Sequence, residues 1–266
     1  MKRSIEDTSV AFIGAGNLAT NLAKALYRKG FRIVQIYSRT EESAQSLAQM
    51  VEAECTTALS DVTKDAQLYI VSLKDAALVR LLPEIVAGGE RKALWVHTAG
   101  SIPMDIWAGH VERYGVFYPM QTFSKLREVD FRDIPIFVES RSEEDTRFLK
   151  DIAAALSEQV YEATSEQRKS LHLAAVFTCN FTNHMYALAA ELLKKYQLPF
   201  EAMLPLIDET ARKVHELEPR AAQTGPALRY DENVIDGHIC MLADEPEMQE
   251  LYWKISESIH RLAAGK

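Results

Sequence analysis

Two glycines and an alanine near the start of the chain have a spacing that could bind a nucleotide. The stretch VAFIGAGNLATNLAKAL, residues 10–26, places Gly14, Gly16 and Ala19 as G-x-G-x-x-A between an apolar run and an amphipathic helical pattern. The first glycine permits a tight turn, the second lets the backbone approach a pyrophosphate, and the small third residue lets helix and strand pack closely. The helix N-terminus adds free N–H groups and a partial positive charge. We therefore predict a dinucleotide site, with a purely structural turn as the alternative. Its predicted phosphate-binding residues are Gly14, Ala15, Gly16, Asn17 and Leu18.

The end of the second apolar run indicates which dinucleotide binds. An acidic side chain about 20 residues after the glycines would hold the ribose 2′-hydroxyl of NAD. This chain has Ser38, Arg39 and Thr40 there instead. A guanidinium and two hydroxyls suit the 2′-phosphate of NADP, so NADP is the predicted cofactor. The alternative is that Ser38 or Thr40 only caps the following helix while Arg39 is solvated.

Two further strand ends are expected to complete the cofactor site. The runs IVSLKD and VHTAGS end near positions 75 and 101, and ligands of open α/β sheets bind beyond the carboxyl ends of the strands. One predicted group, beside the ribose and nicotinamide, is Ser72, Leu73 and Lys74, and the facing group is Thr98, Ala99 and Gly100. Lys74 could equally be a solvated loop lysine, and His97 could be a hydrogen-bonded histidine without a direct role.

These loops require an alternation of strands and helices, which the first part of the chain has. Apolar runs near residues 8–15, 32–38, 67–73 and 93–99 alternate with helical patterns, which predicts βαβ units and a parallel sheet. Further strands are predicted at GVFYPM, IPIFVES and QVYEAT, with a helix over 143–156. From Ser165 the patterns are helical, beginning with a long helix over 165–195. We predict a doubly wound, mostly parallel α/β domain over residues 1–162 and an all-helical domain over 163–266.

Composition narrows the class of protein. With 266 residues, 47% of them hydrophobic, the chain can bury a substantial core. A net charge of −8 disfavours nucleic acid or an anionic membrane as the main partner. The three cysteines have no CxxC spacing, so neither a disulfide framework nor a metal site is predicted. No secretory signal or membrane-spanning run is predicted either, and we expect a cytoplasmic protein.

Four motifs give the chain a family resemblance. The front half resembles the NADP-binding domain of pyrroline-5-carboxylate reductases, deazaflavin-dependent NADP oxidoreductases and 6-phosphogluconate and 3-hydroxyacid dehydrogenases. The segments VHTAGS, FYPMQTFS, SLHLAAVFTCNFTNHM and TGPALRYDENVIDGH resemble, in this order, the Rossmann-like NADP oxidoreductases with a C-terminal helical domain of unknown function. The resemblance covers nearly the whole chain. One departure is Tyr118, where these proteins commonly have a histidine before the proline.

The long helix carries the candidate catalytic residues. At 100° per residue, His172, Asn180 and Asn183 fall on one polar stripe of an otherwise apolar helix. We predict that the stripe lines a substrate pocket, with the asparagines as hydrogen-bond donors and His172 as a proton donor. The alternative is a polar patch at a helix or dimer interface. The resemblance to 3-hydroxyacid dehydrogenases implies a catalytic lysine four residues before the asparagine, but Val176 occupies that position.

The expected activity is NADP(H)-dependent hydride transfer to or from a small polar substrate, such as an imine, ketone or hydroxyacid, in a cleft between the domains. The missing lysine slightly favours an iminium, which already carries its proton. A non-catalytic NADP-binding sensor or scaffold is the alternative. We also expect a homodimer through the helical domain, because a helix of about 31 residues spans roughly 46 Å and a small domain can bury only part of it.

Overall fold

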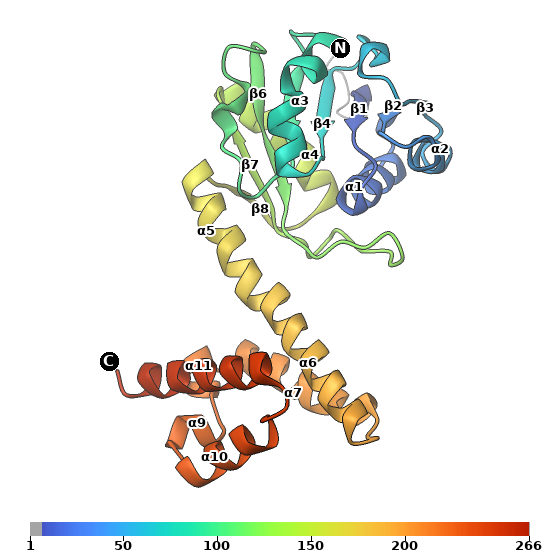
Figure 1. Cartoon of the computed structure of the whole chain (residues 1–266). Coiled ribbons are helices and arrows are strands. Elements are labelled where there is room, and N and C mark those ends of the chain that lie inside the picture. Colours follow the sequence, from blue (N-terminus) through green and yellow to red (C-terminus); the bar gives the residue numbers. More distant parts are fainter. Residues whose placement is uncertain (1–6, 266) are drawn as a thin grey trace. The chain divides into compact units, whose positions relative to one another are not determined.

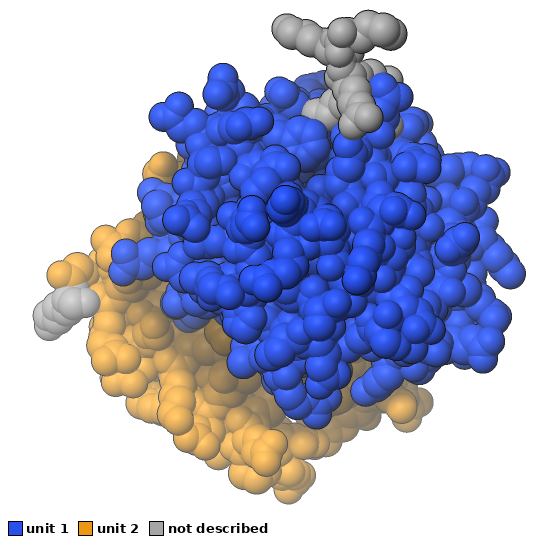
Figure 2. Space-filling view, turned by 90° about the horizontal axis from the view of Figure 1, so that it is seen from above, with its two compact units in different colours: residues 1–179 blue, residues 180–266 orange. Residues whose placement is uncertain are grey.

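The computed structural model describes residues 7–265. Tertiary contacts divide the chain into two compact units, Met1–Cys179 and Asn180–Lys266, which Figure 2 shows in different colours. The first unit extends beyond the 162/163 boundary expected from the sequence. The reason is that the helix beginning at Ser165 is hydrogen-bonded to the sheet through Arg168 and Glu139.

The first unit is built on one eight-stranded sheet (Figure 1). Its strands are β1 Ser9–Ile13, β2 Arg32–Tyr37, β3 Glu54–Thr56, β4 Leu68–Val71, β5 Leu94–His97, β6 Arg113–Pro119, β7 Ile136–Ser140 and β8 Val160–Glu162. They lie in the order β3-β2-β1-β4-β5-β6-β7-β8. The β6–β7 pair is antiparallel and the other pairs are parallel. This confirms the predicted doubly wound, mostly parallel sheet of Rossmann type followed by helices.

Helices cover both faces of the sheet because its strands are apolar on both sides. The helices of this unit are α1 Asn17–Arg28, α2 Glu41–Met50, α3 Asp75–Gly88, α4 Glu143–Leu156 and α5 Ser165–Ala175. Val10 and Phe12 of β1 belong to the buried cluster that includes α1, α2 and α4. Ala11 and Ile13 belong to the cluster that includes α3. Successive side chains of a strand point to opposite faces, so β1 is buried on both.

The long helix predicted over 165–195 is present but is not α-helical throughout. It begins at a capping box formed by Thr164 and Gln167 and runs as α5 to Ala175. A π-helical segment, Val176–Phe181, follows, and α6 continues from Thr182 to Lys195. A π-helical turn bonds i to i+5 and inserts a residue into the turn. The uniform 100° per residue assumed from the sequence therefore does not hold between His172 and Asn183.

The second unit is helical, as predicted. Besides α6 it contains α7 Leu204–Glu216, α8 Pro219–Ala222, α9 Pro226–Arg229, α10 Glu232–Met241 and α11 Pro246–Ala263. Among its described residues, only Ala227, Ile235, Leu242 and Ser256 are buried. Across residues 7–265, no helix is long and apolar enough to span a membrane.

Candidate active site

The glycine turn after β1 has the geometry that its sequence predicts. Gly14 has φ +121°, a conformation that favours glycine, and a Cβ there would overlap the carbonyl oxygen of Ser72. Gly16 occupies the N-cap of α1 without a side-chain cap, and a Cβ built on it would meet no atom within 4 Å. Ala19 is fully buried against the sheet. The turn therefore presents uncapped helix N–H groups beside open space, which fits a bound diphosphate.

The loop after β2 leaves its polar side chains available. Thr40 is the N-cap residue of α2, but its side chain makes no capping hydrogen bond. The alternative role of Thr40 as a side-chain cap is therefore wrong. Ser38 is half-buried, with its backbone N–H bonded to Thr56, and Arg39 is exposed. Together, one guanidinium and two hydroxyls lie at the N-terminal end of α2, where an anion is favoured.

The loops after β4 and β5 contact each other and the glycine turn. The Thr98 hydroxyl donates to the Ser72 hydroxyl at 3.0 Å. A Cβ on Gly14 would lie 3.3 Å from the Leu73 side chain. Lys74 is exposed at the N-cap position of α3. The structure thus brings together three of the predicted loops, those of Gly14, Ser72 and Thr98, at the carboxyl ends of adjacent parallel strands.

His97 is a buried structural histidine at the end of β5. Its side chain is fully buried; Nδ1 accepts the N–H of Ala99 at 3.2 Å, and Nε2 lies 3.4 Å from the carbonyl oxygen of Pro103. Burial, and next the positive charge of Arg168, lower its pKa from 6.5 to about 3. His97 is therefore neutral at pH 7 and restrains the loop that follows it.

His172 lies over the same loop and is paired with Tyr118. A Cβ on Gly100 would be 2.7 Å from Cγ of His172, so the ring packs directly on this glycine. His172 Nδ1 is 3.2 Å from the Tyr118 hydroxyl, and Tyr118 lies beyond the level at which β6 pairs with the end of β5. Burial raises the pKa of the Tyr118 phenol. At neutral pH the phenol is consequently protonated and can donate a hydrogen bond.

Tyr118 and Arg168 are the site residues that sequence reasoning missed. Tyr118 was visible as a departure from a motif, which marked its position but not its partner. Arg168 was not recognisable, because a single arginine in a helical pattern usually lies on the solvated face. In the structure its side chain is 1% exposed and pairs with Glu139.

Two of the predicted catalytic residues, Asn180 and Asn183, belong to the second unit, and both are exposed. In the same unit, Asp231 caps α10, and the His238 ring pairs with the Tyr252 hydroxyl at 2.8 Å. The roles proposed for Asn180 and Asn183 stay predictions.

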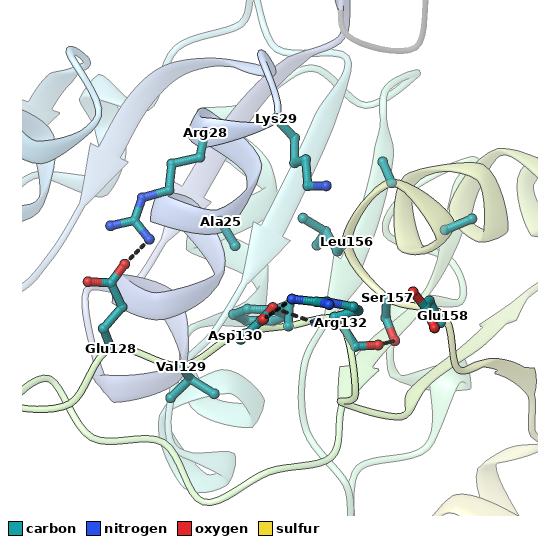
Figure 3. A pocket seen from close by; sticks show the side chains of 13 residues that line it. Ala25, Arg28, Lys29, Glu128, Val129, Asp130, Arg132, Leu156, Ser157 and Glu158 are labelled. Carbon is teal, nitrogen blue, oxygen red and sulfur yellow. Dashed lines mark hydrogen bonds and ion pairs between the residues drawn. The ribbon is translucent and has the colours of Figure 1, made fainter.

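A separate cavity of about 590 Å³ lies at the C-terminal ends of α1 and α4. Figure 3 shows Arg28 paired with Glu128 and Arg132 paired with Asp130 among the residues that line it. None of the predicted site residues lines this cavity. Within residues 7–265, no three His, Cys, Asp or Glu side chains group as a metal site, and the cysteines are free and exposed.

Two family models match the sequence. One, described as NADP oxidoreductase coenzyme F420-dependent, matches residues 9–99. The other, a domain of unknown function named DUF2520, matches residues 134–259. Comparison with curated proteins gives no match.

Comparison with solved structures gives matches that cover nearly the whole chain. A Bacteroides fragilis protein assigned as an NADP oxidoreductase has 74% sequence identity and a TM-score of 0.94, over 97% of this chain and 100% of its own. The imine reductase from Myxococcus stipitatus in complex with NADP⁺ has 15% identity and a TM-score of 0.65, over 97% and 93% of the two chains. Pyrroline-5-carboxylate reductase from Coxiella burnetii has 16% identity and a TM-score of 0.57, over 97% and 98%. The latter two share the fold. The identity and coverage of the first show that this chain belongs to the family of NADP oxidoreductases in which this nucleotide-binding domain precedes DUF2520.

Proposed function

We propose that the protein transfers hydride between NADP(H) and a small polar substrate, such as an imine, a ketone or a hydroxyacid. The supporting observation is the row of loops at one sheet edge, which follow β2, β1, β4 and β5 in spatial order. The strand order reverses direction between β1 and β4, and dinucleotides bind across such a point. In this reading the adenosine half lies over β2, the diphosphate over the Gly14 turn, and the nicotinamide half over β4 and β5.

The chain's own residues have distinct tasks in this proposal. Gly16 and the N-terminus of α1 bind the diphosphate, and Ser38, Arg39 and Thr40 bind the 2′-phosphate. Ser72 and Thr98, joined by their hydroxyl hydrogen bond, flank the nicotinamide ribose. When bound, the nicotinamide supplies or accepts the hydride, and the protein contributes position and electrostatics.

Tyr118 and His172 are the proposed proton-transfer pair. The phenol is protonated at neutral pH, its oxygen lies beside His172 Nδ1, and the imidazole lies on Gly100 of the nicotinamide loop. A substrate atom reached by either group would gain or lose its proton there. Val176, which begins the π-helical segment, supplies no titratable group. The absence of a lysine at this position favours an iminium acceptor, which needs little proton transfer.

The cofactor assignment is tested by Arg39→Ala. Removing the guanidinium is expected to cut the preference for NADPH over NADH by at least about tenfold, or about 1.4 kcal/mol, because one charge-assisted contact to the 2′-phosphate is lost. Calorimetric titration of both nucleotides on wild type and variant measures this change.

Arg32→Ala is the matched control, since Arg32 is exposed at the other end of β2 and carries the same charge. It should leave the preference unchanged. Equal loss of NADPH affinity in both variants would indicate general electrostatics and contradict the assignment. Failure of the wild type to bind either nucleotide would overturn the oxidoreductase proposal.

We further propose that the protein is a homodimer through its second unit. In the described part of this unit, α6 and α7 contain no buried residue, although many of their side chains are large and apolar. Leu204, Leu206, Val214 and Leu217, for example, are exposed. A groove of about 350 Å³ between α6, α9 and α11 is lined mainly by apolar side chains. A second copy that covered the groove and the exposed apolar side chains of α7 would bury apolar surface that the single chain leaves in contact with water.

Ile255→Glu is expected to weaken the dimer. Ile255 lines the groove on α11, and burying a carboxylate in an apolar interface is costly. The dimer dissociation constant should rise by at least about tenfold, as measured by sedimentation velocity over a concentration series. Val79→Glu, an equivalent change at an exposed position of α3, should leave it unchanged. A wild type that sediments as a monomer throughout would refute the dimer.

A further inference from the structure

Arg168 is a charged residue with almost no access to solvent. Its side chain is 1% exposed, and its guanidinium cannot lose its proton under physiological conditions. Such a group is tolerated only where a counter-charge and acceptors surround it. Glu139, on β7, supplies the charge by pairing with Nη1 of Arg168.

The remaining donors of Arg168 hold the loop after β5. Nε donates to the carbonyl oxygen of Ala99 at 3.2 Å, and Nη2 donates to that of Ile102 at 2.6 Å. One planar guanidinium therefore fixes both ends of the segment 99–102. A lysine has a single point charge and could not match both carbonyls and the carboxylate with the same geometry.

Other contacts restrain the same segment from different directions. Ser165 donates to Glu139 and accepts the backbone N–H of Met104 at 2.8 Å. The Ser101 hydroxyl donates to Asp75 at the start of α3. The N–H groups of Gly100 and Ser101, in contrast, make no hydrogen bond within the described part of the chain. The loop is thus held by its carbonyls and side chains, and these two successive N–H groups have no partner in it. Gly100 is buried beneath His172, whereas Ser101 is partly exposed.

We propose that Arg168, together with Glu139, is a positioning residue for the nicotinamide half of the NADP(H) site. It holds residues 99–102 so that the partly exposed Ser101, whose N–H has no partner, is presented to the bound nucleotide or substrate, with His172 packed on Gly100. Arg168 itself, buried behind the loop carbonyls, acts through this loop. This inference rests on the proposed function, because it assumes that NADP(H) lies across β4 and β5.

The test compares two nucleotides that differ only in the nicotinamide ring. NADPH would contact residues 99–102 through its nicotinamide ring, whereas 2′-phospho-ADP-ribose keeps the ribose beside Ser72 and Thr98 but has no ring to contact them. Arg168→Lys keeps the positive charge beside Glu139 but removes the planar guanidinium that bonds both loop carbonyls. The variant is expected to bind NADPH at least about tenfold more weakly, while its affinity for 2′-phospho-ADP-ribose stays within about twofold of wild type.

Glu139→Gln is the second variant, in case Arg168→Lys does not fold. Glutamine keeps the shape of the side chain and an acceptor oxygen but removes the charge that balances Arg168. The loss of affinity should again be confined to NADPH. Arg113→Lys is the matched control, because Arg113 pairs with the buried Asp145 elsewhere in the same unit. It should leave both affinities unchanged even if the melting temperature falls.

Hydrogen exchange gives a readout that does not depend on ligand. The N–H groups of Ala99 and Met104, which are bonded in the structure, should exchange faster in Arg168→Lys than in wild type, relative to the sheet amides of β1. Equal loss of affinity for both nucleotides, or an unchanged NADPH affinity in a folded variant, would overturn the positioning role. A wild type that binds 2′-phospho-ADP-ribose and NADPH equally would also overturn it. A wild type that binds neither would instead refute the proposed function on which it rests.

Discussion

Gly14→Ala is expected to destabilise the first unit and abolish NADPH binding. The residue has φ +121°, and its added methyl group would overlap the backbone carbonyl of Ser72 at the end of β4. A central strand end cannot move aside cheaply, so strain and overpacking should together cost about 2–4 kcal/mol of unfolding free energy. Urea denaturation and calorimetric titration with NADPH measure the two effects.

Gly16→Ala is the matched control because it makes the same chemical change two residues later. Its φ is −78°, and a Cβ meets no heavy atom within 4 Å, so stability should be nearly unchanged. NADPH affinity should nevertheless fall by at least about tenfold, since the methyl would occupy the space proposed for the diphosphate. An unchanged affinity in Gly16→Ala would show that the phosphates do not approach the backbone there.

Acid is expected to weaken the first unit through His97. The folded-state pKa is lowered to about 3 from 6.5, so the unfolded chain binds the proton more readily between these values. The stabilising contribution of neutral His97 is therefore complete above about pH 6.5 and is lost as the pH falls towards 3. Between pH 7 and pH 4 this group should remove about 3 kcal/mol of unfolding free energy, at 1.36 kcal/mol per pKa unit.

His97→Asn isolates this contribution. The variant is less stable at pH 7 but should lose about 3 kcal/mol less than wild type between pH 7 and pH 4. Urea denaturation followed by tryptophan fluorescence reports mainly on this unit, because two of the three tryptophans, Trp95 and Trp107, are fully buried in it. His215→Asn, the same change at an exposed position, is the control for a general effect of replacing a histidine. Parallel profiles for wild type and His97→Asn would contradict the lowered pKa.

Most of the sheet could be predicted from the sequence because its strands are apolar runs separated by turn residues. The strand β3, Glu54–Thr56, was missed for the opposite reason. It has three residues, none of them buried, and lies at the edge of the sheet, so its place depends on pairing with β2 rather than on its own side chains. Short edge strands of this kind carry almost no local signal.

The cofactor loops were also predictable, because topology alone brings the carboxyl ends of parallel strands together. Contacts between residues far apart in the sequence could not be predicted in this way. Tyr118 and His172 are 54 residues apart, and nothing local to either specifies their pairing. The burial of Arg168 likewise depends on two carbonyls of residues 99–102 and on the carboxylate of Glu139, all distant in the sequence. The π-helical segment was missed because apolar periodicity does not distinguish i+4 from i+5 hydrogen bonding.

The π-helical segment Val176–Phe181 has a consequence for how relatives of this chain can diverge. Because a π-helical turn takes up one extra residue, deleting one residue within it would restore regular α-helical bonding and leave the later side chains in nearly their present directions around the helix axis. A relative could therefore be one residue shorter here and still present the residues that follow on the same faces of the helix, so a gap in an alignment at this point would not by itself mean that those faces had changed.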